Sequence, residues 1–267
     1  MMSSEKKVAV VTGGSSGIGL ATAKKLLADG YAVYELSRRE PAESGGIVHV
    51  TADVTSDADL AAAAEKILAA EGHVDALVCC AGFGISGASE LTPSSESSRQ
   101  LDVNVLGAAR TVCAFLPAMR EAGRGNIVFV SSVAGVIPIP FQSWYSASKA
   151  AINAYALALR SEVAPFGVKV SAVMPGDAST GFTDARKKMP VNEAYTARVE
   201  KSVSVMEHDE RNGMSPASVA ALVAKTAERK NPAPLYTAGF QYKVFTLLIR
   251  LLPRRFASFL VGKIYGG

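Results

Sequence analysis

A glycine-rich stretch near the start of the chain constrains its fold more than any other feature. Residues 12–19 read Thr-Gly-Gly-Ser-Ser-Gly-Ile-Gly, with an apolar β-branched run before them and helix-forming residues 20–27 after them. Strand, glycine turn and helix in this order can hold a pyrophosphate, because backbone approaches closely and the helix N-terminus presents free N–H groups. The alternative is an ordinary β–α turn, since many glycine turns bind nothing.

Apolar runs and helical periodicities alternate along the rest of the chain. Beyond the first strand at residues 8–11, strands are predicted at 31–36, 47–50, 74–80, 125–132 and 168–173, and helices at 58–70, 94–116 and 144–166. Each connection is long enough for a crossover between parallel strands. The sequence therefore predicts a single-domain α/β fold over residues 1–235, a doubly wound parallel sheet (Rossmann fold) with helices on both faces.

Two later segments differ from this pattern. Residues 177–214 are polar and weakly periodic, which is typical of a lid, and Ser215-Pro216 then opens a helix. Residues 236–267 form a basic amphipathic extension, predicted as a pair of helices around Pro253. This extension covers the substrate cleft or a subunit interface, or it lies on an anionic membrane surface.

Composition bounds location and partners. Of 267 residues, 49% are hydrophobic and 19% charged, which is enough for one deep core. We find neither a signal peptide nor an apolar run that would span a bilayer, and so expect a cytoplasmic protein with, at most, peripheral membrane contact. The net charge of +4 comes from the tail, since no acidic residue follows Glu228, and we expect no nucleic-acid partner.

The cysteines and histidines predict no metal site. Cys79, Cys80 and Cys113 are expected to pack as small buried hydrophobes in a reducing compartment. The three histidines lack ligand spacing, so no metal is expected.

The end of the second predicted strand bears on cofactor choice. NAD-binding folds usually have an acid there, whereas this chain has Ser37 and Arg38, which suit a 2′-phosphate and predict NADP(H). The alternative is a solvated basic loop. Asp53 is predicted to be free for a ligand, because Ser56 and Asp57 are better placed to cap the next helix.

Three polar residues further along can move a proton. Tyr145 and Lys149 stand four apart in a predicted helix, so their side chains share a face. An ammonium beside a phenol is expected to lower its pKa, and an oxidised nicotinamide would add to this. Ser132 ends the fifth predicted strand, at the sheet edge where α/β folds bind ligands, and can donate to a carbonyl oxygen. Each signal is weak singly, and the glycine loop strengthens them together.

With these residues the sequence resembles the short-chain dehydrogenase/reductase family to about residue 235. The motifs that carry the resemblance are Thr12-Gly13-x-x-x-Gly17-Ile18-Gly19, Asp53-Val54, Ala81-Gly82, Asn104-Val105, Ser131-Ser132-x-x-Gly135, Tyr145-x-x-x-Lys149 and Pro175-Gly176-x-x-x-Thr180. One departure is Cys79-Cys80 before Ala81-Gly82, where most members have two asparagines.

The resemblance implies roles for these positions. Tyr145 is expected to exchange the proton, Lys149 to lower its pKa and hold the nicotinamide ribose, Ser132 to orient the substrate carbonyl, and Asn104 to keep a water in a relay to Lys149. The residues expected at the cofactor are Gly13, Ser15, Ser16, Gly17, Ile18, Gly19, Ser37, Arg38, Asp53, Val54, Ala81, Gly82, Tyr145, Lys149, Pro175, Gly176 and Thr180.

Within the family, the pattern is most similar to hydroxysteroid and retinol dehydrogenases. Five residues are expected to form an apolar mouth or else to pack against the lid or a second subunit: Val136, Ile137, Ile139, Phe141 and Trp144. We therefore predict an NADP(H)-dependent enzyme that interconverts a carbonyl and an alcohol on a steroid or other lipid, acting as a homodimer or homotetramer. Alternatives are a 3-oxoacyl reductase of fatty-acid synthesis and a non-catalytic NADP-binding regulator.

Overall fold

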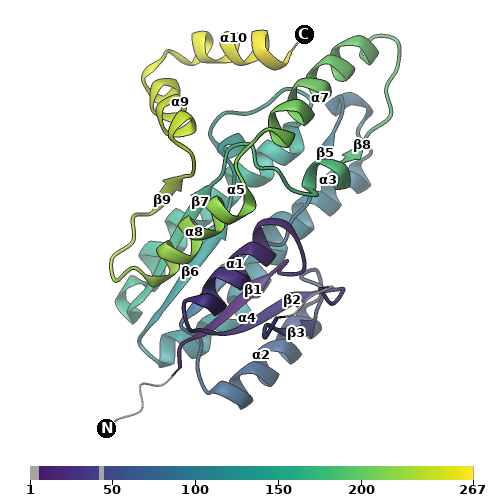
Figure 1. Cartoon of the computed structure of the whole chain (residues 1–267). Helices are drawn as coiled ribbons and strands as arrows, with labels where there is room; N and C mark the ends of the chain where they lie inside the picture. Colours follow the sequence, from purple (N-terminus) through teal and green to yellow (C-terminus); the bar gives the residue numbers. More distant parts are fainter. Residues whose placement is uncertain (1–5, 42–44, 267) are drawn as a thin grey trace.

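A parallel seven-stranded sheet forms the centre of the computed structural model, which describes residues 6–41 and 45–266 (Figure 1). Residues 1–5, in the N-terminal stretch where no signal peptide was predicted, lie outside the described residues. The strand order is β3-β2-β1-β4-β6-β7-β9, and every paired neighbour is parallel. The strands are β1 (Val8–Thr12), β2 (Ala32–Ser37), β3 (Val48–Thr51), β4 (Ala76–Cys79), β6 (Gly125–Val130), β7 (Val168–Met174) and β9 (Leu235–Thr237). The predicted doubly wound sheet is confirmed.

Helices cover both faces of the sheet because both faces of each strand are apolar. Val8 and Val10 belong to the core on one face, whereas Ala9 and Val11 belong to the core on the other. One face is covered by α1 (Gly17–Ala28) and α8 (Pro216–Glu228), and the other by α2 (Asp57–Glu71), α4 (Gly107–Glu121) and α5 (Ser143–Val163) (Figure 1). As expected, the Ser56 hydroxyl caps α2 and Ser215 caps α8.

The helix predicted at residues 94–116 is longer and is interrupted. It consists of α3 (Ser94–Leu101), a π-helical turn at Asp102–Leu106, and α4, which continues to Glu121. By length and composition this helix could cross a membrane, although no spanning run was expected from the sequence. Its side chains Val112, Phe115 and Met119 are fully buried against the sheet, so this side of the helix packs in the core.

The predicted lid contains regular structure that its sequence does not reveal. A short helix α6 (Phe182–Ala185), the strand β8 (Lys187–Lys188) and the long helix α7 (Thr196–Arg211) lie within residues 177–214. The strand β8 pairs with β5 (Ile85–Ser86), in the loop that follows β4. Two-residue strands are too short to show an alternating pattern, so they escaped prediction.

The C-terminal extension consists of two helices, α9 (Phe240–Leu251) and α10 (Arg254–Tyr265), which meet at Pro253 as predicted. The strand β9 spans the expected boundary at residue 235, so the sheet runs slightly further than expected. Short 3-10 helices complete the fold, at Ser89–Leu91, Val133–Gly135 and Ala164–Phe166.

One of the three cysteines is exposed, contrary to the prediction. Cys79 is buried in β4 and Cys80 is partly buried behind it, and burial raises the pKa of the Cys80 thiol to about 11. Cys113 is exposed on α4, so the expectation of a third buried cysteine was wrong. Its position on the solvent side of an amphipathic helix is the reason.

Candidate active site

A cavity of about 1000 Å³ opens at the carboxyl ends of the central strands. The strand order reverses between β1 and β4, and such a reversal leaves a crevice at this edge of an open α/β sheet. Every residue predicted at the cofactor lines the cavity, and so does Ser132. Asn104 is the one predicted site residue that does not line it. The fold therefore gathers residues between Gly13 and Thr180 around one space.

The glycine loop forms one wall, and its geometry fits a dinucleotide. Gly13 has φ +67°, and a Cβ there would lie 2.8 Å from the Ala81 Cα, so only glycine lets the loop pack against the Ala81-Gly82 turn. The loop then enters α1 at Ser16, whose side chain makes no capping hydrogen bond. The first N–H groups of α1 thus stay available at the cavity for phosphate oxygens.

Basic and acidic side chains meet at the far end of this loop. The Arg38 side chain is 67% exposed, and its Nη1 lies 3.9 Å from Asp53 Oδ2. Asp53 is less free than predicted, because its carboxylate accepts hydrogen bonds from the Thr55 N–H and hydroxyl, at 2.9 and 2.8 Å. Glu35, the acid nearest the end of β2, is fully buried and bonded to His49, so it does not face the cavity.

Ser132, Tyr145 and Lys149 come together beside the loop. The Ser132 hydroxyl accepts a hydrogen bond from the Ala134 N–H at 3.1 Å, and its interaction with the Tyr145 side chain lowers the pKa of the phenol. Lys149 Nζ lies 5.7 Å from the centre of the Tyr145 ring and donates to the Val130 carbonyl at 2.9 Å. The shared helix face predicted for Tyr145 and Lys149 is therefore present.

The electrostatics of this group differ from the expectation. Burial raises the pKa of Tyr145 to about 12, and the hydrogen bond from Ser132 only partly opposes the rise. Burial also lowers the pKa of Lys149 to about 8. The expected lowering of the tyrosine pKa is thus absent, because desolvation outweighs the opposing effects of Ser132 and Arg186.

Asn104 lies behind the cavity wall, in the π-helical turn. Its Oδ1 accepts from the Phe83 N–H at 3.0 Å, and its Nδ2 donates to the Phe83 carbonyl at 3.0 Å and to the Ser148 hydroxyl at 3.1 Å. A Cβ on Gly82 would lie 3.1 Å from Asn104 Oδ1 and 3.8 Å from Lys149 Nζ. Asn104 therefore joins the loop after β4 to α5 close to Lys149, and the predicted water relay stays a prediction.

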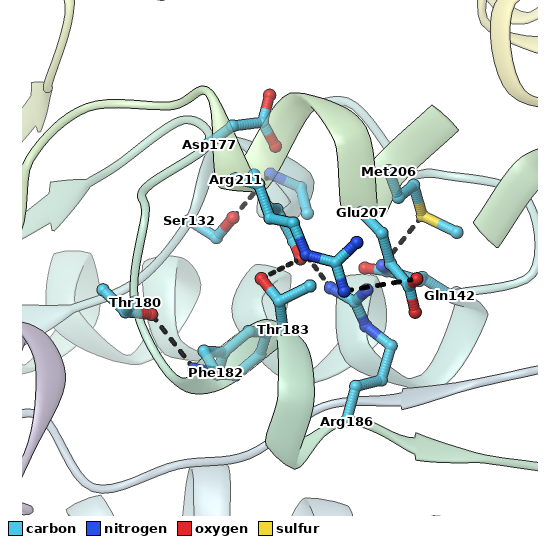
Figure 2. Close-up of polar contacts among 12 residues, drawn as sticks. Ser132, Gln142, Asp177, Thr180, Phe182, Thr183, Arg186, Met206, Glu207 and Arg211 are labelled. Atoms are coloured by element: carbon cyan, nitrogen blue, oxygen red, sulfur yellow. Dashed lines mark hydrogen bonds and ion pairs between the residues drawn. The ribbon is translucent and has the colours of Figure 1, made fainter. Parts of the chain in front are cut away.

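Beyond Tyr145, Ile139 is the one lining side chain of this end that the sequence predicted, and most of the other lining side chains come from distant segments. The Phe182 ring lies 5.5 Å from the Tyr145 ring, and Gln142 Nε2 donates to Met206 Sδ at 2.8 Å (Figure 2). Ile139, Phe182, Met206, Glu210 and Tyr265 line this end. Phe182 comes from α6, Met206 and Glu210 from α7, and Tyr265 from α10, and no local motif predicts their meeting.

An ion pair holds the lid helices together at this end. Arg186, whose side chain is fully buried, pairs with Glu210, and the Thr183 hydroxyl donates to the other Glu210 oxygen at 2.7 Å. Figure 2 shows Thr183 and Arg186 converging there from α6 and the turn after it. The pair therefore fixes α6 against α7 beside the cavity.

The predicted apolar mouth is only partly present. Of its five residues only Ile139 lines the cavity, so the expectation was wrong for the other four. Phe141 packs with Val199, Val203 and Met206 of α7, which is the alternative of packing against the lid. Side chains in one short turn point in several directions, so sequence proximity to Ser132 did not place them in the site.

Comparisons with known proteins show what the whole chain is similar to. A sequence model of the short chain dehydrogenase family matches residues 7–190. A 3-ketodihydrosphingosine reductase from Bacteroides thetaiotaomicron is 41% identical over 231 residues, which cover 85% of this chain and 86% of that protein. Human 17-beta-hydroxysteroid dehydrogenase type 1 is 35% identical over 67% of this chain and 59% of its own length.

A solved structure extends the likeness to the whole fold. The crystal structure of a short-chain dehydrogenase from Streptomyces avermitilis matches with a TM-score of 0.83 at 33% identity, over 94% of both chains. The chain therefore belongs to the short-chain dehydrogenase/reductase family and is an oxidoreductase. The predicted likeness to hydroxysteroid dehydrogenases is confirmed.

Proposed function

We propose that this enzyme reduces the keto group of a long-chain lipid with NADPH, and that 3-ketodihydrosphingosine is such a substrate. The observation that carries the proposal is that Ser132, Tyr145 and Lys149 line one cavity, which continues past Phe182, Ile139 and Met206. An apolar wall beyond the reacting groups suits an alkyl chain. The 41% identical reductase of 3-ketodihydrosphingosine supports this substrate class over a steroid.

The residues then divide the chemistry. NADPH, when bound, supplies the hydride to the carbonyl carbon. With a pKa of about 12, Tyr145 is protonated at neutral pH and can give its proton to the developing alkoxide. Ser132 donates a hydrogen bond to the same oxygen. Lys149 holds the nicotinamide ribose and returns a proton to the Tyr145 phenolate. Asn104 keeps the proton path to Lys149 in place.

The preference for NADP(H) is part of the proposal. Arg38 extends from the end of β2 to the cavity and is two-thirds exposed, so its guanidinium can meet a 2′-phosphate. The one acid of β2, Glu35, is buried away from the cavity, so it would not hold a 2′-hydroxyl. The remaining predicted residues, from Gly13 to Thr180, would hold the rest of the dinucleotide.

Assembly and location complete the proposal. Two large apolar residues are exposed here, Leu106 in the π-helical turn before α4 and Leu157 on α5. Their exposure suits a homodimer or homotetramer built on these helices. We propose that residues 177–214 act as the lid and that residues 1–235 form the catalytic domain. A cytoplasmic enzyme with peripheral membrane contact through residues 236–267 fits the apolar substrate.

Turnover of three substrate classes tests the function. NADPH consumption is measured with 3-ketodihydrosphingosine, with steroid ketones and with 3-oxoacyl thioesters. We expect the first to give the highest kcat/KM, and Tyr145→Phe to reduce it by a factor of about 1000 or more while NADPH affinity stays within about threefold. Preference for the thioesters would favour fatty-acid synthesis. Tight NADPH binding without turnover of any class would favour the regulator.

A further inference from the structure

The C-terminal extension leaves a broad apolar face uncovered. Eight large hydrophobic side chains on its two helices are 41–80% exposed, namely Phe240, Val244, Leu247, Leu248, Leu251, Phe256, Phe259 and Ile264. We call these eight residues the apolar face. Elsewhere in the described chain only Val48, Leu106, Leu157, Phe166 and Val191 are large hydrophobics of comparable exposure. The face is therefore a concentrated feature of this segment.

The opposite side of the extension is docked on the catalytic body. A Cβ on Gly176 would lie 2.2 Å from the Tyr242 ring, and the Tyr242 hydroxyl donates to Asp177 Oδ2 at 2.5 Å. Val261 of α10 is buried, and Tyr265 lines the substrate end of the cavity. Figure 1 shows α9 and α10 standing outside the helices that cover the sheet. The apolar face thus has a fixed orientation next to the cavity.

Charge selects the partner of this face. From Arg229 onward the chain has seven basic residues and no acidic residue. Five of them lie on α9 and α10, at Lys243, Arg250, Arg254, Arg255 and Lys263, and Lys263 Nζ lies 5.7 Å from the Phe259 ring. A symmetric contact between two copies would set these bases against each other. An anionic bilayer accepts both the apolar side chains and the bases.

We propose that the apolar face docks this enzyme on an anionic lipid bilayer, with the basic residues at the level of the headgroups. Long basic side chains can keep their charge in water while their stems lie along apolar surface. If the proposed function holds, Tyr265 marks the end of the cavity at which a lipid ketone enters from the bilayer. Membrane docking itself does not depend on that activity.

Sedimentation with vesicles tests docking without substrate or cofactor. The full chain is mixed with vesicles of phosphatidylcholine alone or with phosphatidylglycerol added, at low and high salt. We expect binding only to the anionic vesicles, weakened by salt because screening shortens the reach of the bases. The variant Leu247→Glu/Leu251→Glu should bind about tenfold or more weakly. Phe166→Glu, which changes an apolar residue of similar exposure outside the extension, should bind as wild type does.

Two controls make the outcomes decisive. Circular dichroism and turnover of a water-soluble ketone check that the variants are folded, and sedimentation velocity gives their oligomeric state. Wild-type protein that does not sediment with anionic vesicles, or that binds neutral vesicles equally well, would overturn the proposal. So would a double variant that binds like wild type. A wild-type oligomer that the double variant dissociates would instead identify the face as a subunit interface.

Discussion

At the scale of single residues, burial sets the charge states in the site. Lys149 is enclosed with a pKa near 8, while the Tyr145 pKa is raised to about 12. Both shifts favour the neutral side chain, because a charge in the interior loses its hydration. The buried lysine therefore lowers the stability of the folded protein, and the proposed chemistry requires it at this position.

Lys149 gives a pH-dependent prediction for stability. Its pKa is about 10.4 in the unfolded chain and about 8 in the folded one, so between these values the unfolded state binds more protons and stability rises with pH. Lys149→Met should lack this rise. At pH 7 its free energy of unfolding should exceed that of the wild type by about 2 kcal/mol, after the lost hydrogen bond to the Val130 carbonyl is subtracted. Denaturant unfolding at pH 7 and 9.5 measures both; equal pH slopes in the two proteins would contradict the assignment.

Arg38 gives a prediction for cofactor choice. Arg38→Asp should weaken NADPH binding by about 100-fold, because a charge-assisted bond to the 2′-phosphate becomes a repulsion. NADH lacks that phosphate, so its affinity for the same variant should change by about threefold or less. Fluorescence titration with both cofactors makes the comparison. An equal loss for the two would mean that Arg38 only lines the loop.

At the scale of elements, the lid is held by one buried ion pair. Arg186 and Glu210 lie in the turn after α6 and in α7, and Thr183 completes the bonding of the carboxylate. Removing one partner of such a pair leaves a buried charge without compensation. Because Glu210 also lines the cavity, the same contact links lid position to substrate binding.

The ion pair yields a prediction with a matched control. Glu210→Gln should reduce the unfolding free energy by about 3 kcal/mol and raise the substrate KM, since Arg186 stays buried. Asp184→Asn, in the same segment, breaks an exposed pair with Arg211 at 3.5 Å and should change stability by less than about 1 kcal/mol. Urea unfolding and steady-state kinetics compare the two variants. Similar effects of both would show that the pair does not hold the lid.

At the scale of the whole molecule, buried phenols limit stability at high pH. Burial is the main cause that raises the pKa to about 12 for five tyrosines: Tyr31, Tyr34, Tyr145, Tyr155 and Tyr265. The folded pKa exceeds the unfolded value near 10, so the contribution to stability is complete below pH 10 and is lost as pH rises to about 12. Tyr31 and Tyr34 are buried and the other three are partly buried, so the alkaline limit of stability depends on how the fold encloses these phenols.

We therefore expect cooperative unfolding between about pH 10 and 12. Tyrosinate absorbance and far-ultraviolet circular dichroism, followed in one titration, should change together between these pH values, because buried and partly buried phenols ionise mainly as the chain opens. Ionisation of all eight tyrosines with the circular dichroism unchanged would contradict this.

Much of the fold was predictable because its signals are local. The glycine loop lies between β1 and α1, and the caps Ser56 and Ser215 lie within one turn of the helices that they begin. Strands of β-branched residues alternate with amphipathic helices, and parallel pairing follows from the crossovers. The Tyr145–Lys149 face follows from helical spacing alone.

By itself the sequence determined the family, the doubly wound sheet, the edge at which the cavity opens and nearly all residues that line its cofactor side. Those depend on neighbours along the chain and on the rule that parallel strands end at one edge. Only the tertiary structure decided three features. The first is the substrate end, where Gln142 contacts Met206, 64 residues away in the sequence. The others are the position of Asn104 outside the cavity lining and the raised pKa of Tyr145. These depend on desolvation and on side chains from distant segments, which no spacing along the chain encodes.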